Sequence, residues 1–437
     1  MATLMVEILC LFLSVSVVCG AECQGKPSPD ARQNLNPIFG GMPTFVRQVR
    51  NGKLYQAGIS QDSFYVVHVW GTPYEMGYAQ GELMKTETIN FMNSVWKYLE
   101  DQVIGDINST FFQPWFLKDV ADFGLVAALD LELTITRKYT GNYFFEEAQG
   151  LADATGVDYM TIQRIHVIGE LTKGDCSMMG AWGSAVRDPN SLLQLRALDW
   201  NTDGPFKDFP QVTVYHPSSG NGHPFANIGW TGWLGSITGF NKAQLSISEI
   251  GVTFPDKTFG TESRFGIPFT YILRDVLQFD TSLAGAQTRL SNAHRTCNLI
   301  LGVGDAKSRS FRGIEYSASV ANFYTDTDMQ PTADWHPRIK NVVYYGMDWL
   351  CPSFSEVLAR QISTHYGNLS PDVIVRDIVS IEQSGSLHIA IYDMANEAVY
   401  IANARSSTES GPLNAYERTF IRLNTTALFG TPAPAIY

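Results

Sequence analysis

Cys176 stands directly after Gly174 and Asp175, a pair that is typical of turns. If the peptide bond between Asp175 and Cys176 were cut, the new N-terminal residue would carry a thiol and a free α-amine together. The pKa of an α-amine, about 8, lies much closer to neutrality than that of lysine, so this amine can act as the base for its own thiol. Taken alone, Cys176 equally fits a buried apolar residue or one half of a disulfide.

Two charged residues follow the cysteine at short range. Arg196 and Asp199 stand 20 and 23 residues after Cys176. An arginine beside a cysteine lowers the pKa of the thiol, and a carboxylate can hold an α-ammonium group in place. Residues three apart lie on opposite faces of a regular strand, so the strand must end or bulge if both side chains reach one site. The alternative is an ordinary salt bridge at a strand end.

The segment around these residues predicts a β-hairpin that places Cys176 at the start of its first strand. A run with strand character covers 177–186, a polar turn occupies 187–190, and a second run covers 192–198.

The chain before Cys176 is predicted to be largely helical. Residues 22–60 are polar and contain Pro and Gly, which indicates a weakly ordered entry, and 64–70 read as a strand. Gly77 and Gly81 lie four residues apart, so they would share a helix face against which another element packs closely. Apolar residues recur at helical spacing in four segments, 83–99, 112–140, 142–154 and 159–171.

The chain after Cys176 changes to short strands separated by a few helices. This pattern predicts an α+β fold of two sheets with helices outside. The expected strands are 212–215, 226–230, 236–240, 244–250, 297–302, 313–317, 387–394 and 398–402, and the expected helices are 267–277, 282–294, 353–365 and 371–379.

Composition excludes several classes of protein. The 437 residues carry a formal net charge of −12, which argues against a nucleic-acid partner. Charged residues make up 17% of the chain, too few for a coiled coil or a disordered chain. The histidines show no metal-ligand spacing, and the chain has neither a Gly-x-Ser-x-Gly elbow nor a phosphate-binding glycine loop. We therefore expect no metal and no cofactor.

The N-terminus indicates the secretory pathway. An apolar run over 4–19 ends in small residues and is shorter than the ~20 residues of a membrane-spanning helix, so 1–21 is predicted to be a signal peptide. Three glycosylation sequons, at Asn108, Asn368 and Asn424, agree with this route. We expect a glycoprotein that is secreted or lysosomal, with no integral membrane segment after signal removal.

An oxidising compartment would pair some of the cysteines that remain after signal removal. A disulfide of Cys351 with Cys23 or with Cys297 is expected, and the sequence does not choose between them. A pairing with Cys23 would tether the two halves of a cleaved chain.

Four segments in this order resemble the N-terminal nucleophile (Ntn) cysteine amide hydrolases, which include penicillin acyltransferase, bile-salt hydrolase, acid ceramidase and N-acylethanolamine acid amidase. The resemblance is greatest to the penicillin-acyltransferase-like branch. The segments are Gly-Thr-Pro-Tyr-Glu-Met-Gly at 71–77 with Gly81, Asp175-Cys176-Ser177, Arg196 with Leu198-Asp199-Trp200, and Asn298 with Leu299-Ile300 followed by 314–317.

This resemblance implies a four-layer αββα sandwich of two antiparallel sheets and a role for each matching residue. Cys176 is then the nucleophile, freed by self-cleavage after Asp175, with Arg196 and Asp199 flanking it. The side chain of Asn298 donates to the oxyanion. Glu249 corresponds to a glutamate that ceramidase-like members keep near the oxyanion site.

The function expected from these residues is hydrolysis of a linear amide, an N-acyl bond, through a thioester. The precursor would divide into a signal peptide (1–21), a mostly helical α-chain (22–175) and a β-chain (176–437) that carries the αββα core. The substrate is a small N-acyl amide or lipid amide, because aromatic residues are dense near the proposed site. An acyltransferase, a phospholipase-B-like esterase and a non-catalytic glycoprotein remain as alternatives.

Overall fold

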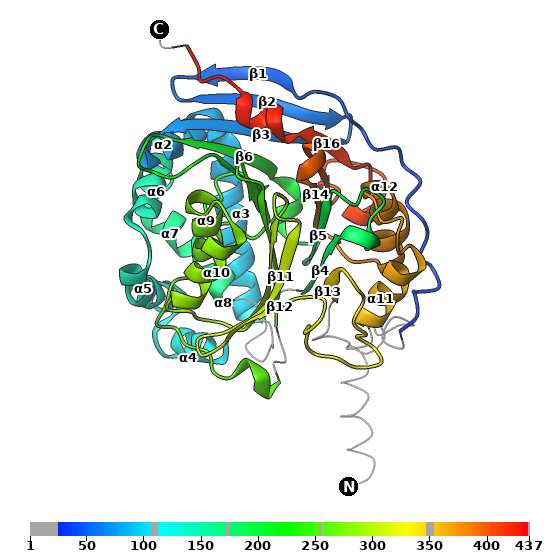
Figure 1. Ribbon diagram of the computed structural model, residues 1–437. Coiled ribbons are helices and arrows are strands. Elements are labelled where there is room, and N and C mark those ends of the chain that lie inside the picture. The colour runs from blue at the N-terminus through cyan, green and yellow to red at the C-terminus, as the bar shows by residue number, and fades with distance from the viewer. Residues whose placement is uncertain (1–24, 106–111, 172–174, 253–255, 347–353, 436–437) are drawn as a thin grey trace, which may run out of the picture.

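A computed structural model describes residues 25–105, 112–171, 175–252, 256–346 and 354–435. Two β-sheets lie at its centre with helices outside them (Figure 1). The larger sheet has the strand order β1 (Thr44–Val49), β2 (Gly52–Ile59), β3 (Asp62–Gly71), β6 (Pro210–Pro217), β7 (Phe225–Trp230), β8 (Gly239–Asn241), β9 (Leu245–Gly251), β10 (Leu299–Asp305), β11 (Ser310–Tyr316), β12 (Ala321–Tyr324). The smaller sheet has the order β13 (Val342–Gly346), β4 (Asp175–Trp182), β5 (Leu192–Asp199), β14 (His388–Asp393), β15 (Ala398–Asn403), β16 (Ile421–Asn424).

Helices cover the outer faces of both sheets. Helices α9 and α10 pack on the larger sheet and α11 on the smaller one, while β4 and β5 contact β9 and β10 across the centre. The expected α+β sandwich, helix layer on sheet on sheet on helix layer, is therefore confirmed. The helices are α2 (Pro73–Leu83), α3 (Lys85–Gly105), α4 (Pro114–Phe123), α5 (Leu125–Thr136), α6 (Asn142–Thr155), α7 (Tyr159–His166), α8 (Ile168–Leu171), α9 (Phe269–Phe279), α10 (Leu283–Asn292), α11 (Phe354–Thr364), α12 (Pro371–Val373), α13 (Ser380–Glu382) and α14 (Thr425–Gly430).

The segments before and after Cys176 share one sheet. Strand β3 pairs with β6 in parallel from Tyr65↔Gln211 to Gly71↔Pro217, and the other strand pairs are antiparallel. The segment before the cysteine is therefore not only helical, because it supplies β1, β2 and β3.

The expectation of a weakly ordered entry over 22–60 is wrong for its second half. Strands β1 and β2 lie there because they pair with one another and β2 pairs with β3. Strand β1 is an edge strand whose side chains are mostly exposed, so its sequence has no apolar alternation by which it could be recognised. Pairing within the folded sheet decides its conformation.

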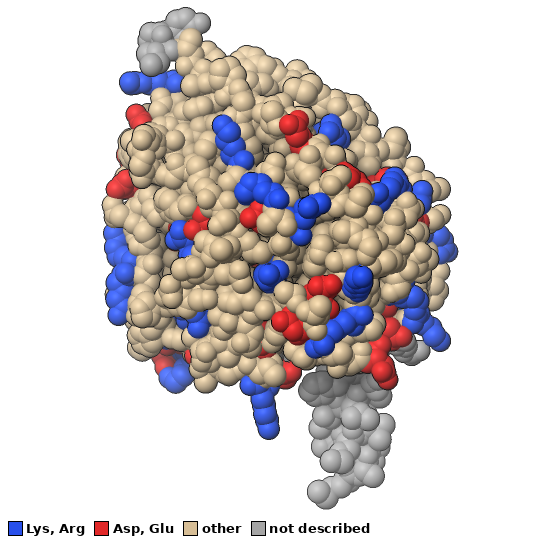
Figure 2. Space-filling view, viewed as in Figure 1, with Lys and Arg blue, Asp and Glu red and all other residues tan. Residues whose placement is uncertain are grey.

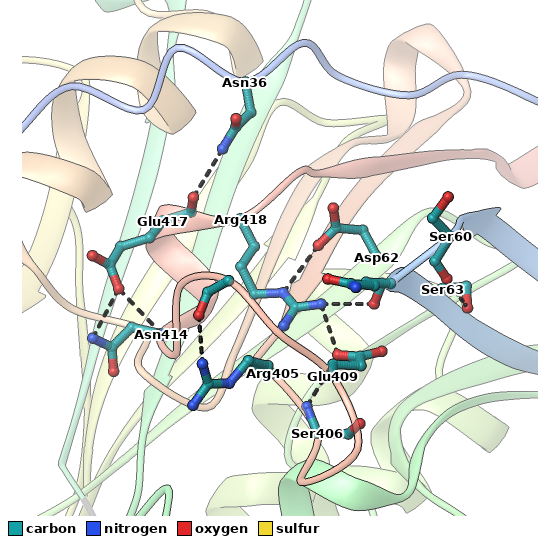
Figure 3. A network of polar contacts seen from close by, with 12 residues as sticks. Asn36, Ser60, Asp62, Ser63, Arg405, Ser406, Glu409, Asn414, Glu417 and Arg418 are labelled. Carbon is teal, nitrogen blue, oxygen red and sulfur yellow. Dashed lines mark hydrogen bonds and ion pairs between the residues drawn. The ribbon is translucent and has the colours of Figure 1, made fainter.

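Ion pairs also join the two segments. Arg274 on α9 pairs with Glu147 on α6, and both side chains are fully buried. Arg418 Nε lies 3.0 Å from Oδ1 of Asp62, the first residue of β3 (Figure 3). Elsewhere the charge is dispersed: Figure 2 shows acidic and basic side chains interspersed over the face in view.

The predicted close packing at Gly77 and Gly81 is confirmed. A Cβ at Gly77 would overlap the main-chain carbonyl of Glu147, and one at Gly81 would lie 2.7 Å from Cβ of Ala154. Both contacts are with α6, which contacts α2 along its length. The two glycines therefore bring α2 and α6 together by leaving out a side chain.

Substituting Gly77→Ala should lower the free energy of unfolding by about 1–3 kcal/mol, because main-chain atoms of α6 cannot move aside independently. Urea-induced unfolding followed by circular dichroism measures the change. Gly40→Ala is the control, since a Cβ at Gly40 has no neighbour within 4 Å. Equal midpoints for the two variants would contradict the close-packing argument.

Candidate active site

Cys176 is the second residue of β4, one position later than predicted. It pairs with Leu198 of β5 in an unbroken antiparallel register that runs from Asp175↔Asp199 to Trp182↔Leu192. Its side chain is 1% exposed. The hairpin predicted for 177–198 is thus confirmed, and it holds the thiol at one end of the smaller sheet.

The thiol contributes to the wall of an apolar pocket. Its free volume is about 60 Å³, room for a few water molecules. Glu249 and Thr270 are the other residues in the wall with ionisable or hydroxyl side chains. The remaining lining residues are Ile168, Gly169, Leu198, Trp200, Phe206, Trp230, Trp233, Ile237 and Phe269.

Arg196 and Glu249 form a buried ion pair beside the thiol. Arg196 Nη2 lies 3.1 Å from Glu249 Oε2, and the two side chains are 0% and 8% exposed. Arg196 Nη1 also donates to the carbonyl oxygen of Ala197 at 2.9 Å. Glu249 lies on β9, where it pairs with Leu301 of β10. The structure therefore brings three predicted site residues together, one of them from the opposite sheet.

Asp199 faces away from this group. Strand β5 continues without a bulge from Arg196 to Asp199, so the two side chains lie on opposite faces, as their spacing predicts for a regular strand. The Asp199 carboxylate accepts hydrogen bonds from the main-chain nitrogens of Gly385 and Ser386 at 2.8–2.9 Å and from Ser384 Oγ at 2.5 Å. Since Asp199 pairs with Asp175, its carboxylate lies beside the strand end where the proposed scissile bond begins.

Burial governs the ionisation of the thiol. It raises the pKa of Cys176 far above its ordinary value, while the charge of Arg196 and a hydrogen bond from it act in the opposite direction. The Glu249 carboxylate raises the thiol pKa further. In the uncut chain the thiol is therefore protonated at neutral pH.

Asn298 lies outside the lining of the Cys176 pocket. It precedes β10, its main-chain nitrogen donates to Glu262 Oε1 at 3.1 Å, and its carbonyl oxygen accepts from Val252 at 3.3 Å. The side chain is buried, and its Oδ1 has no hydrogen-bond partner among the described residues. The unpartnered atom is the acceptor of the amide, whereas an oxyanion would be bound by the Nδ2 donor.

Two groups near the site were missed from the sequence. The Ser384-Gly385-Ser386 turn donates hydrogen bonds to Asp199. Its small polar residues stand directly before the strand predicted at 387–394, and this composition could have indicated a turn there. His388 of β14 pairs with Leu198 and lies in hydrogen-bond contact with Thr238 Oγ1 at 2.8 Å. Burial lowers the pKa of His388 well below its ordinary value, and Arg196 lowers it further. No local spacing in the sequence points to that contact.

Several predicted features fall outside the described residues, namely the signal peptide, Cys23, Asn108 and Cys351. Asn368 is exposed and its Oδ1 accepts from Arg187, whereas Asn424 Oδ1 caps α14 by accepting from Ala427 N at 2.7 Å. The described residues contain no cluster of three or more potential metal ligands. Among them, no helix combines the length and the apolar character needed to cross a membrane.

Burial raises the pKa of Glu249 to about 6, so folding favours its protonated form. Wild-type stability should therefore fall as pH rises from about 4.5 to 6, by about 2 kcal/mol in total. Glu249→Gln removes this term, so its stability relative to wild type should rise over the same window.

Urea unfolding at a series of pH values measures the difference, in chains that also carry Cys176→Ala to keep them uncut. Glu82→Gln, at an exposed position, is the control. A pH-independent difference between Glu249→Gln and its parent would show that Glu249 does not titrate in this window.

Comparisons with known proteins give full-length relatives and distant structural likenesses. No family model matches the chain. Solved structures with partial likeness include an N-acylethanolamine-hydrolyzing acid amidase ortholog from Caenorhabditis elegans (TM-score 0.38, 14% identity, 50% of this chain and 92% of that one). Penicillin V acylase from Agrobacterium tumefaciens is another (TM-score 0.35, 13% identity, 52% and 83%). A conjugated bile acid hydrolase mutant from Clostridium perfringens is a third (TM-score 0.36, 11% identity, 59% and 95%).

Two proteins of Dictyostelium discoideum match almost the whole sequence. Protein dcd1A is 33% identical over 449 residues, which cover 97% of this chain and 97% of dcd1A. Protein dcd1B is 33% identical over 413 residues, which cover 91% of this chain and 81% of dcd1B. The chain therefore belongs to the family of dcd1A and dcd1B.

Proposed function

We propose that this protein is a self-processing Ntn cysteine amidase that hydrolyses N-acyl amides. The observation that carries the proposal is the position of Cys176: its thiol lies at a strand end, beside the Arg196 guanidinium, in the wall of an apolar pocket. A cut directly before Cys176 would give this residue a free α-amine, which can act as the base for the thiol. The turn-prone residues Gly174 and Asp175 are the expected place for that cut.

Self-cleavage starts with attack of the Cys176 sulfur on the carbonyl carbon of Asp175. The peptide C–N bond breaks as the thioester forms, and the former amide nitrogen becomes the α-amine. Water then hydrolyses the thioester, which returns the thiol and leaves Asp175 with a terminal carboxylate. Asp199 is suited to hold the new ammonium group, because its strand position faces Asp175 and its carboxylate is fixed by the turn at 384–386.

In the mature enzyme the α-amine takes the proton of the thiol, and the thiolate attacks the substrate carbonyl. The Asn298 amide and the positive charge of Arg196 stabilise the developing negative charge. The amine then protonates the leaving nitrogen, and water releases the acid from the thioester. An amine in place of water would make the product a new amide, which is the acyltransferase alternative.

The pocket supports a substrate with an apolar acyl group. Most of its lining side chains are aromatic or aliphatic, and burying such a group is worth roughly 25 cal/mol per Å². Because the free volume is only about 60 Å³, these side chains have to move apart to admit a long chain.

The compartment and the two-chain product are part of the same proposal. A signal peptide, glycans at Asn108, Asn368 and Asn424, and a disulfide through Cys351 would place the enzyme in the secretory pathway, as a secreted or lysosomal protein. An acidic lumen below pH 6 would neutralise Glu249 and remove the carboxylate that raises the thiol pKa. The shared sheet and the Arg274–Glu147 pair would keep the cut chains together.

The wild-type protein should appear as two polypeptides, the second beginning at Cys176. Cys176→Ala should leave a single uncut chain, because the attacking sulfur is absent. N-terminal sequencing and denaturing electrophoresis of the purified protein check this.

Cys297→Ala is the matched control, since it removes a second buried cysteine outside the pocket lining and should still be cut. Active protein in which Cys176 remains internal would refute the proposal. An intact, inactive wild-type chain would favour the non-catalytic glycoprotein, and preference for esters over matched amides would favour the esterase.

Asn298→Ala should lower kcat by roughly 10²–10³-fold, since an oxyanion donor acts in the transition state. KM should change little. Steady-state kinetics on a chromogenic N-acyl amide, with the cut protein confirmed by electrophoresis, measure both constants. An unchanged kcat would remove Asn298 from the site.

A further inference from the structure

The apolar pocket contains two buried polar atoms that nothing in the described structure satisfies. Trp233 Nε1 and Thr270 Oγ1 have no hydrogen-bond partner among the described residues. Trp233 is 6% exposed and Thr270 is 1% exposed, and both residues line the pocket. A buried donor without a partner costs about 1–3 kcal/mol, so two in one pocket need an explanation.

Gly235 shows that these two atoms lie close to the same main-chain position. A Cβ at Gly235 would lie 2.9 Å from Thr270 Oγ1 and 3.5 Å from Trp233 Nε1. The same Cβ would lie 2.9 Å from Thr270 Cβ, so Thr270 packs closely on Gly235 and leaves no room for a side chain there.

The loop that carries Trp233 is held rigidly. Its indole stacks on His166 at 5.0 Å and meets Trp230 edge to face at 5.6 Å. The main-chain nitrogen of Leu234 donates to His166 Nε2 at 2.8 Å, and Arg274 Nη1 donates to the Leu234 carbonyl at 2.8 Å. The direction of the indole N–H is thus fixed before any ligand arrives.

The main chain around Thr270 is also held by hydrogen bonds. Thr270 lies in the first turn of α9, and its carbonyl oxygen accepts from Ser236 N at 2.8 Å. Asn227 Nδ2 donates to the Gly235 carbonyl at 3.2 Å. The loop is therefore tied to α9 through Ser236 and to β7 through Gly235.

An indole N–H only donates, whereas a hydroxyl donates and accepts. Together they match an oxygen atom that accepts from the indole, such as a hydroxyl or keto oxygen. In ligand sites a few fixed polar groups in an apolar lining set orientation and specificity. A substrate lacking the oxygen would leave both groups unpaired, which is the strongest form of discrimination between analogues.

We propose that Trp233 Nε1 and Thr270 Oγ1 form a polar subsite that binds a hydroxyl or keto oxygen on the acyl group of the substrate. The inference rests on the proposed amidase function for its substrate, but the subsite itself can be tested by binding alone. The ligand class is an oxygenated acyl chain rather than a plain hydrocarbon one.

The test compares medium-chain N-acyl amides that differ only in a hydroxyl group placed at successive carbons of the acyl chain. In the cut wild-type protein, kcat/KM for the best hydroxylated amide should exceed that of the plain amide. Thr270→Val should lower this preference roughly tenfold, measured as the ratio of kcat/KM for the two amides within the same variant. Thr270→Ser, which keeps the hydroxyl, should retain the preference.

Trp233→Phe should also lose the preference, because phenyl keeps the stacking and removes the N–H. Trp230→Phe is the matched control from the same pocket and should affect both substrates alike. If wild type does not discriminate, or if Thr270→Val affects both substrates equally, the two groups hold only water and the proposal is wrong.

A second readout does not need catalysis. Binding of the free hydroxylated and plain acids is followed by quenching of tryptophan fluorescence, in cut or uncut protein. Tighter binding of the hydroxylated acid that Thr270→Val abolishes would support the subsite even if no amide is hydrolysed. Equal binding of the two acids with normal amidase activity would overturn the subsite and leave the proposed function standing.

Discussion

A guanidinium, a carboxylate and a thiol are held out of water between two β-sheets, and the rest of the site depends on that arrangement. Arg196 comes from the smaller sheet and Glu249 from the larger one, so the ion pair also fixes the two layers relative to each other. Removing one partner of a buried pair leaves an unpaired charge, which costs more than the pair contributes. The same desolvation holds the thiol of the uncut chain in its neutral form, while the charge of Arg196 favours the thiolate.

Successive side chains of a strand point to opposite faces of the sheet, so residues of the proposed site lie in two different environments. The side chains of Cys176 and Arg196 lie on the face of the sheet that looks toward the apolar pocket, and Asp199 lies on the other face, against the 384–386 turn. The main-chain nitrogen of Cys176 lies in the strand between these two faces. This geometry suits a residue that uses its side chain and its own backbone nitrogen together.

The sequence predicted the hairpin, the sandwich and the close packing of Gly77 because each leaves a local pattern: strand character, alternation of element types, and a spacing of four. It did not predict β1, β2, β12, β13 or β16. Strand β1 is exposed and takes its conformation from its partner, and β13 is a short buried run that periodicity cannot assign. The ion pair of Arg196 with Glu249, and the contacts of His388 and Trp233, join residues far apart in the chain. Spacing in the sequence carries no information about such pairs. Asn298 and Glu249 became candidate site residues only through the resemblance of the motifs, in their order, to those of the Ntn cysteine amide hydrolases.

The parallel pairing of β3 with β6 has a consequence for how the protein can be made. Without β1, β2 and β3, strand β6 would be an open edge with unpaired backbone groups, a template for aggregation. In the single chain, the covalent link keeps the partner strands at high effective concentration while the sheet assembles. In the proposed cut form, the pair would be held by the barrier to separation rather than by the ability to reassemble. The uncut chain would then act as its own folding template, and two separately produced halves would not be an equivalent starting material.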